Sequence, residues 1–110
     1  MSKLRYKKGE LNSLIEDAKN GDMKAMEELI RRIQKNIYTT FSHLTNKKED
    51  ISDLTQETLL KMAKSIYKLK EIRSFKTWLN HIIANVFNDY VRRRPNNLVE
   101  IDEQQLSEIK

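Results

Sequence analysis

Apolar residues along this chain recur every three to four positions, which is the period of an α-helix. Four such stretches can be distinguished, and no stretch has the alternating pattern of a strand. The first helix is expected at about residues 10–20, because Gly21 is suited to end it. Its apolar face would hold Leu11, Leu14, Ile15 and Ala18. The pattern predicts an all-α fold, a compact helical bundle of about four helices.

The second predicted helix follows at once, with Asp22 placed to cap its first turn. Its apolar stripe continues for five turns, so the segment is predicted to be one long amphipathic helix. The stripe consists of Met26, Leu29, Ile30, Ile33, Ile37, Phe41 and Leu44.

A polar linker at residues 46–49 precedes the third predicted helix. We expect Asp50 or Ser52 to cap this helix, which would extend to about Leu69. Its buried stripe would be Ile51, Leu54, Thr58, Met62, Ile66 and Leu69.

A short basic loop at residues 70–73 leads to the fourth predicted helix. Ser74 is suited to cap it, and Pro95 disfavours further helix after about Arg94. The apolar face is broad, which indicates packing against more than one neighbour. It comprises Trp78, Leu79, Ile82, Ile83, Val86, Phe87, Tyr90 and Val91.

A chain of 110 residues holds one domain at most. We expect a basic N-terminal arm at residues 1–9, a helical domain at 10–94 and an acidic linker or tail at 95–110. The longest uncharged run is twelve residues, at positions 77–88, and is too short to span a bilayer. No apolar stretch follows the basic N-terminus, so we expect no secretory signal, a cytoplasmic location and no membrane partner.

The net charge of +5 is distributed unevenly along the chain. Residues 60–94 carry a net charge of +7 and residues 95–110 a net charge of −3. A basic excess favours an acidic partner, and nucleic acid is the first candidate. The alternative is a solvated surface that is merely rich in lysine.

The face of the third helix opposite its stripe would be polar and mainly acidic at its start. Asp53 and Glu57 are four residues apart, so both carboxylates project from one side, and Leu60 beside them has no evident place in a core. This face is typical of a docking surface for another helix, although an ordinary solvated face is an equal alternative. It presents Asp53, Gln56, Glu57, Leu60, Lys61 and Lys64.

The polar face of the fourth helix is rich in asparagine, a poor helix former whose presence asks for a reason. Asn and Arg side chains can read base edges by hydrogen bonding, and a basic run at residues 92–94 could meet phosphates. The alternative is a neutral solvated face. This face presents Asn80, His81, Asn85, Asn88, Asp89 and Arg92.

The sequence offers little for catalysis. It contains no cysteine, which excludes a disulfide framework, a thiolate zinc site and a cysteine nucleophile. It contains no P-loop and no nucleophile motif, and His43 and His81 lie on different predicted helices without a paired carboxylate pattern. We therefore expect a non-enzymatic protein without cofactor or metal.

Three motifs occur in order along residues 10–94. The motifs are Gly21-Asp22 with Ala25, Glu27-Glu28-Leu29 and Arg31-Arg32; Asp53-Leu54-Thr55-Gln56-Glu57-Thr58; and Ser74-Phe75-Lys76-Thr77-Trp78-Leu79 followed by Ile82, Asn85, Asp89 and the basic run Arg92 to Arg94. Together they resemble region 2 of the extracytoplasmic-function (ECF) class of bacterial sigma-70 factors, whose fold is an all-α bundle.

The resemblance implies a transcription initiation domain that docks on the clamp coiled coil of the β′ subunit of RNA polymerase. Asp53, Gln56 and Glu57 match the positions that make this contact, and Leu60 could supply an apolar anchor. The expected polymerase-binding residues are Asp53, Gln56, Glu57, Leu60, Lys61 and Lys64.

The resemblance also implies recognition and melting of the promoter −10 element through the non-template strand. Lys70, Arg73 and Lys76 would hold phosphates of the displaced strand, whereas Trp78 is expected in the core rather than as a stacking platform. Asn80 stands where the family often has an aromatic residue, and His81 and Ala84 stand where it often has Arg. Base contacts are expected from Asn80, His81 and Asn85, and further DNA contacts from Asn88, Arg92 and Arg93.

The resemblance leaves several roles open. Nothing after Pro95 resembles the family's second domain, the helix-turn-helix that reads the −35 element, so we expect the N-terminal half of a longer sigma factor. The alternatives are a subunit of a split sigma factor that works with a separate −35-reading chain, and a relative that binds polymerase without initiating. A helical protein-interaction module without DNA reading, or much less plausibly a compact helix-turn-helix repressor, would be of another class. An anti-sigma factor is an expected partner.

Overall fold

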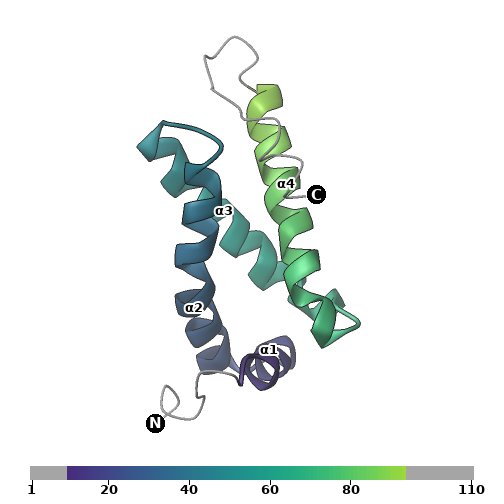
Figure 1. Cartoon of the computed structure of the whole chain (residues 1–110). Helices are drawn as coiled ribbons and strands as arrows, with labels where there is room; N and C mark the ends of the chain where they lie inside the picture. The colour runs from purple at the N-terminus through teal and green to yellow at the C-terminus, as the bar shows by residue number, and fades with distance from the viewer. Residues whose placement is uncertain (1–9, 94–110) are drawn as a thin grey trace.

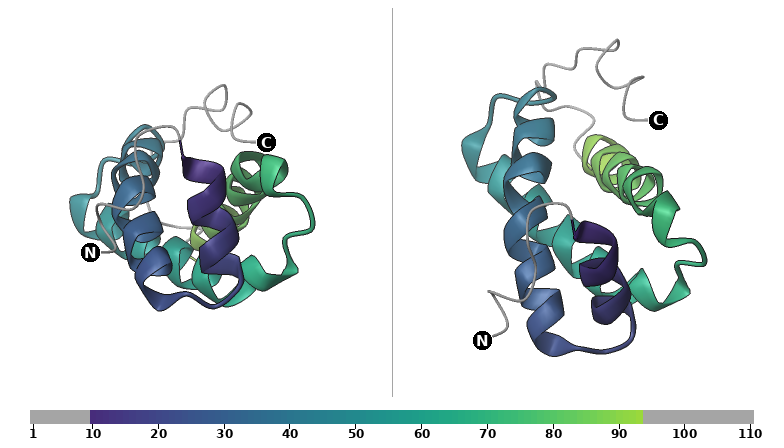
Figure 2. Two further views of the ribbon diagram at one scale, coloured as in Figure 1. Left: turned by 90° about the horizontal axis from the view of Figure 1, so that it is seen from below. Right: turned by 60° about the horizontal axis from the view of Figure 1, so that its bottom comes forward.

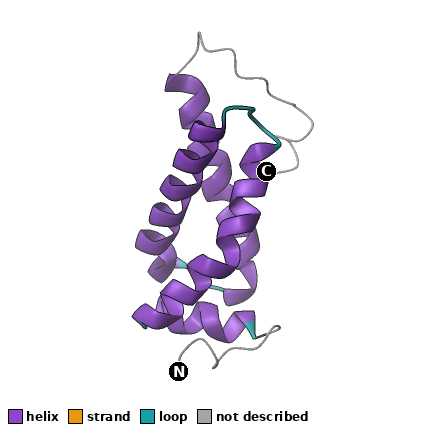
Figure 3. Cartoon of the chain, turned by 90° about the vertical axis from the view of Figure 1, so that its left-hand side faces the viewer, coloured by secondary structure: helices purple, strands orange, loops and turns teal. Residues whose placement is uncertain are grey.

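Four α-helices account for most of residues 10–93, the part of the chain that this computed structural model describes (Figure 1). The basic arm and the acidic tail expected at the two ends, together with Arg94, lie outside the described residues. Within residues 10–93 there are helices, turns and loops but no strand, which confirms the all-α prediction (Figure 3). The elements are α1 (Leu11–Lys19), α2 (Met23–Ser42), α3 (Lys48–Ser65), the 3₁₀ turns η2 (Ile66–Lys68) and η3 (Ile72–Ser74), and α4 (Phe75–Arg93).

The helices enclose one core. Helix α3 packs against α2 on one side and α4 on the other, and α1 packs against α2 and both 3₁₀ turns. Seen from below, the short α1 lies across the end of the bundle from which α2 rises (Figure 2). This arrangement places the outer faces of α3 and α4 at the surface, where partners can reach them.

The turn between α1 and α2 follows from two local residues. Gly21 has a φ of 100°, a left-handed conformation that favours glycine, and its N–H donates a 3.1 Å hydrogen bond to the carbonyl of Ala18. Asp22 then accepts hydrogen bonds from the backbone N–H groups of Lys24 and Ala25, at 3.0 and 3.1 Å. The predicted stop and the predicted N-cap are both confirmed.

The predicted stripes form most of the core. Every residue expected on the stripe of the third helix is buried, although its last two members lie beyond α3 itself. Thr55, outside the predicted stripe, is also buried, and the hydroxyls of Thr55 and Thr58 each donate a 2.8 Å hydrogen bond to the carbonyl four residues before. The predictions were too broad at the edges of the other stripes, because these residues lie at the margin of a helix face. Half-buried rather than buried are Met26, Ile30, Trp78, Ile82 and Val91, and Leu11 of the first stripe is exposed.

The predicted limits of the third helix were wrong at both ends. Helix α3 begins at Lys48, and neither Asp50 nor Ser52 caps it. Asp50 instead lies in the first turn, where its negative charge interacts favourably with the positive end of the helix dipole. Helix α3 ends at Ser65, and the chain continues as the tighter turn η2, which still buries Ile66 and delivers Leu69 to the core. Helix α4 is described as far as Arg93, and its predicted end at about Arg94 lies outside the described residues.

Candidate functional site

The outer face of α3 is exposed much as its sequence pattern predicted. Asp53, Gln56, Lys61 and Lys64 are exposed, whereas Glu57 is half-buried because it faces α4. Leu60 keeps 61% of its surface accessible, so this large apolar side chain does not belong to the core. An apolar residue surrounded by charged groups is typical of the centre of a protein interface.

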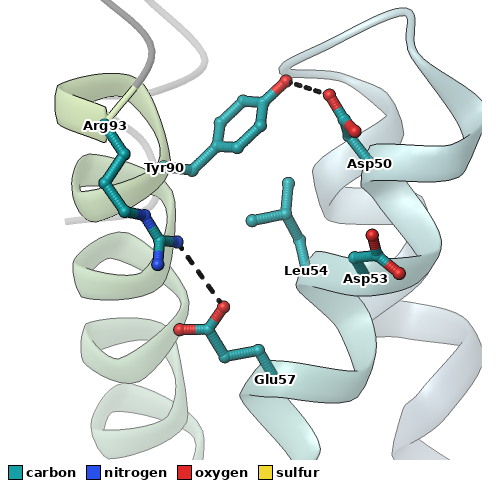
Figure 4. A pocket seen from close by; sticks show the side chains of 6 residues that line it. All are labelled: Asp50, Asp53, Leu54, Glu57, Tyr90 and Arg93. Carbon is teal, nitrogen blue, oxygen red and sulfur yellow. Dashed lines mark hydrogen bonds and ion pairs between the residues drawn. The ribbon is translucent and has the colours of Figure 1, made fainter.

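A cavity of about 360 Å³ lies between α3 and α4 (Figure 4). Two contacts cross between the helices here. The Tyr90 hydroxyl donates a 2.6 Å hydrogen bond to Asp50 Oδ2, and Arg93 Nη2 lies 3.8 Å from Glu57 Oε1. The lining residues are Asp50, Asp53, Leu54, Glu57, Tyr90 and Arg93.

Asp53 differs from the other two carboxylates of this cavity. Among the described residues it forms neither a hydrogen bond nor an ion pair, whereas Asp50 and Glu57 each contact α4. The three acids belong to successive turns of α3, so the cavity and the outer face of α3 form one acidic surface. Such a surface attracts cationic side chains and repels the DNA backbone.

A second hollow, of about 280 Å³, lies where the η2–η3 connection meets the start of α4. Trp78 on its wall is half-buried, and the centre of its ring lies 5.9 Å from that of Phe75. The ring therefore packs on the core and also borders the hollow, which corrects the expectation of a purely core residue. The lining residues are Lys68, Leu69, Lys70, Glu71, Ser74, Thr77, Trp78 and His81.

A third hollow, of about 350 Å³, continues along α4 from the second and shares His81 with it. Its lining residues are His81, Ala84, Asn85 and Asn88. The structure thus brings together four of the residues that sequence reasoning assigned to DNA, namely Lys70, His81, Asn85 and Asn88. Asn80 is half-buried and lines neither hollow.

The basic candidates fall into two groups. Lys70, Arg73 and Lys76 are exposed around the start of α4, where Arg73 also lies 3.7 Å from Glu71. Arg92 and Arg93 lie at the other end of α4, a helix of 19 residues, so that a long stretch of helix separates the two groups. Arg92 pairs with Asp89 on its own helix at 3.6 Å, whereas Arg93 reaches across to α3.

Sequence reasoning missed Tyr67 in η2. Its side chain is 64% exposed, and Lys68 Nζ lies 5.8 Å from the centre of its ring. The sequence could have indicated its exposure, because Tyr67 lies between two stripe residues, Ile66 and Leu69, and does not fit the stripe itself. Sequence reasoning also missed the contact that Asp50 makes with α4.

Residues 10–93 lack two other kinds of feature. No group of three or more acidic or histidine side chains in that range is arranged to hold a metal ion. None of the helices there is both long enough and apolar enough to cross a membrane.

Comparison with known proteins identifies the family. The sigma-70 region 2 family model matches residues 29–96, more than half of the chain, and this range includes the second and third motifs. The chain therefore belongs to the sigma-70 region 2 family. No solved structure matches the chain significantly.

Curated relatives are ECF sigma factors. The ECF RNA polymerase sigma factor SigE of Mycolicibacterium smegmatis is 36% identical over 77 residues, which cover 67% of this chain and 30% of that protein. The ECF RNA polymerase sigma-E factor of Haemophilus influenzae is 32% identical over 88 residues, covering 77% of this chain and 46% of that protein. The corresponding factor of Salmonella typhimurium is 29% identical over 91 residues, covering 79% and 47%. The chain thus spans less than half the length of these relatives.

Proposed function

We propose that this chain acts in transcription initiation, without catalysis of its own, as the region 2 module of an ECF sigma factor. Helix α3 docks on the β′ clamp coiled coil of RNA polymerase. The surface that contains the second and third hollows, from Lys68 in η2 to Asn88 in α4, is called the η2–α4 surface and captures the non-template strand of the −10 element. The observation that carries the proposal is the pairing of two surfaces on adjoining helices: an acidic face with an exposed leucine, and two adjoining hollows, of which one is bordered by Lys68 and Lys70 and the other by His81 and two asparagines.

The outer face of α3 has the chemistry that a basic helical partner requires. Leu60 would enter an apolar site of the partner, while Asp53, Gln56 and Glu57 meet its cationic and polar groups. Lys61 and Lys64 would lie at the rim, where charge affects the rate of association more than the affinity. The same face would serve an anti-sigma factor, because a protein that covers it prevents docking.

The η2–α4 surface has the chemistry of single-strand capture. Removing a base from the stack costs a few kcal/mol, which a pocket for the base must recover. The hollow beside Trp78 is bordered by Lys68 and Lys70, so a base can enter it while its phosphates meet ammonium groups. His81 and Asn85 extend the hydrogen-bonding surface along α4, and Tyr67 adds an exposed ring beside Lys68, which borders the first hollow. Asn80 lines neither hollow, and its base contact stays a prediction from the sequence.

Binding of the chain to bacterial core RNA polymerase tests the proposal. We expect Glu57→Lys to lower the affinity about tenfold or more, because it places a cation opposite the partner's cations. Glu27→Lys is the matched control, since Glu27 is an exposed glutamate on α2, away from the proposed surface. Circular dichroism would verify that both variants remain folded. Wild-type affinity in Glu57→Lys would contradict docking through α3.

A labelled single-stranded oligonucleotide with a −10-like sequence tests the second half of the proposal. We expect the chain, with and without polymerase, to bind it more tightly than a scrambled strand of equal composition. Polymerase binding without this preference would favour the alternative function, a protein-interaction module that does not read DNA.

A further inference from the structure

The two hollows of the η2–α4 surface differ in their charge. Lys68 and Lys70 border the second hollow, and lysine keeps its positive charge over the physiological pH range. The third hollow has no lysine or arginine on its walls, which consist of His81, Ala84, Asn85 and Asn88. His81 is the only ionisable residue among these four, so the formal charge of the third hollow depends on the protonation of one imidazole.

His81 lies where the two hollows meet, because it lines both of them. It is exposed, and it forms no hydrogen bond or ion pair with any residue from 10 to 93. Its two ring nitrogens are therefore accessible to a ligand. A neutral imidazole offers one N–H donor and one acceptor nitrogen, whereas the protonated ring offers two N–H donors and a positive charge.

We propose that protonated His81 holds a phosphate of the bound single strand at the junction of the second and third hollows, so that strand binding takes up a proton. The inference rests on the proposed function, because it assigns a role to one residue of the η2–α4 surface. A strand that occupies both hollows crosses this junction, and a phosphate there meets the ring. When the ring is neutral, the strand is held mainly by the lysines of the second hollow.

The charged groups that face His81 act in opposite directions. Across the second hollow, Lys68 and Lys70 disfavour a further cation, whereas the carboxylate of Glu71 favours one. Glu71 is shared, since Arg73 Nη2 lies 3.7 Å from its Oε1. No charged residue of α1, α2 or α3 lines either hollow.

A strand phosphate at the junction would add a negative charge beside the ring, and a nearby negative charge favours the protonated imidazole. Strand binding therefore promotes proton uptake. By thermodynamic linkage, proton uptake must strengthen strand binding by the same factor, so the affinity should rise as the pH falls through the range in which imidazole titrates.

The expected effect is moderate, because the contact is exposed to water. An exposed ion pair corresponds to a factor of about 1.4 to 5 in an equilibrium constant. Each phosphate contact on a single strand also contributes about 0.7 to the slope of log affinity against log salt. The slope should therefore be steeper at low pH than at high pH, by up to about 0.7.

The experiment measures the affinity of the whole chain for a rhodamine-labelled oligothymidylate at fixed low salt, at about pH 6 and about pH 8. Thymine neither gains nor loses a proton over this range, and histidine is the side chain that changes its charge. The wild type should bind about 1.4 to 5 times more tightly at the lower pH. His81→Gln should lose this difference and bind at both pH values as the wild type does at the higher one.

Two further variants make the result specific. His43→Gln is the matched control, because His43 is the other histidine of the chain and lies exposed at the end of α2, on neither hollow. It should keep the full pH dependence. His81→Lys places a permanent cation at the junction, so it should bind tightly at both pH values. Circular dichroism at each pH verifies that the three variants remain folded.

The outcomes separate this inference from the proposed function. If the wild type binds the probe equally tightly at both pH values, the proton-dependent contact is overturned and the proposed function stands. The same holds if His81→Gln keeps the pH dependence or if His43→Gln loses it. If the wild type does not bind the probe at either pH, strand capture by the η2–α4 surface fails, and the role of His81 fails with it.

Discussion

The hydroxyl of Tyr90 donates a 2.6 Å hydrogen bond to Asp50 Oδ2 and joins the last turn of α4 to the first turn of α3. Tyr90 is 4% exposed, and the centre of its ring lies 5.7 Å from that of Phe87 in the core. This contact holds the arginine-bearing end of α4 beside the acidic helix. It therefore sets the geometry of the cavity between α3 and α4.

Replacing Tyr90 by Phe should lower the free energy of unfolding by about 1–2 kcal/mol, because the change removes a hydrogen bond to a carboxylate but keeps the packed ring. Chemical denaturation followed by circular dichroism measures this. Tyr38→Phe is the control, since Tyr38 is a partly exposed tyrosine on α2, and it should change the stability by less than about 0.5 kcal/mol. Equal stability of Tyr90→Phe and wild type would mean that the bond contributes nothing in solution.

Truncation of Trp78 to Ala should cost about 2 kcal/mol, below the roughly 3–5 kcal/mol typical of a fully buried aromatic residue, because the ring is only half-buried. The same change should weaken binding of a −10-like oligonucleotide, since one side of the ring borders the hollow. Trp78→Phe should recover most of both losses. A large loss of stability with unchanged oligonucleotide affinity would assign Trp78 to the core alone.

Asn85→Ala should weaken binding to a −10-like strand about tenfold, and binding to a scrambled strand much less, because a base-reading amide distinguishes bases by about 1–3 kcal/mol. Fluorescence anisotropy with both strands measures the ratio. Gln34→Ala, at an exposed amide on α2, should leave both affinities unchanged. Equal losses on the two strands would demote Asn85 from base contact to general support.

Salt should weaken oligonucleotide binding steeply. With about four phosphate contacts on a single strand, the slope of log affinity against log salt should be near −3. Lys76→Ala removes one of the expected contacts and should reduce the magnitude of the slope by about 0.7. Lys35→Ala, which removes an exposed lysine of α2, should leave the slope unchanged. A slope near zero for the wild type would exclude phosphate contacts as the source of affinity.

The helices could be predicted from the sequence because the causes of a helix are local. Asp22 caps α2 through N–H groups two and three residues away, and Gly21 ends α1 through its own φ. The stripe of the third helix was correctly assigned to the core even where the helix itself stops, since η2 keeps Ile66 inside. The exposure of Leu60 could be predicted from the same helical period, because Leu60 lies opposite the buried stripe.

The prediction of the helix cap failed because it considered only interactions within a few residues. Asp50 is a suitable cap by its position in the sequence, but it bonds to Tyr90, forty residues further along the chain. Asn80 and Asn85 both belong to the polar period of α4, and only the packing of the bundle decides that Asn80 is half-buried while Asn85 is exposed. Periodicity specifies which side of a helix is polar and not which polar residues meet a neighbouring helix.

The sequence by itself determined the all-α class, the order of the helices, most of the core and the family, because each depends on interactions within a few residues or on a pattern of residue types. Only the tertiary structure decided that Glu57 faces Arg93 and that Trp78 borders a hollow. These relationships depend on how α3, the η2–η3 connection and α4 pack together. Packing is a property of the whole bundle, since a small change in the position of one helix alters every contact across its face.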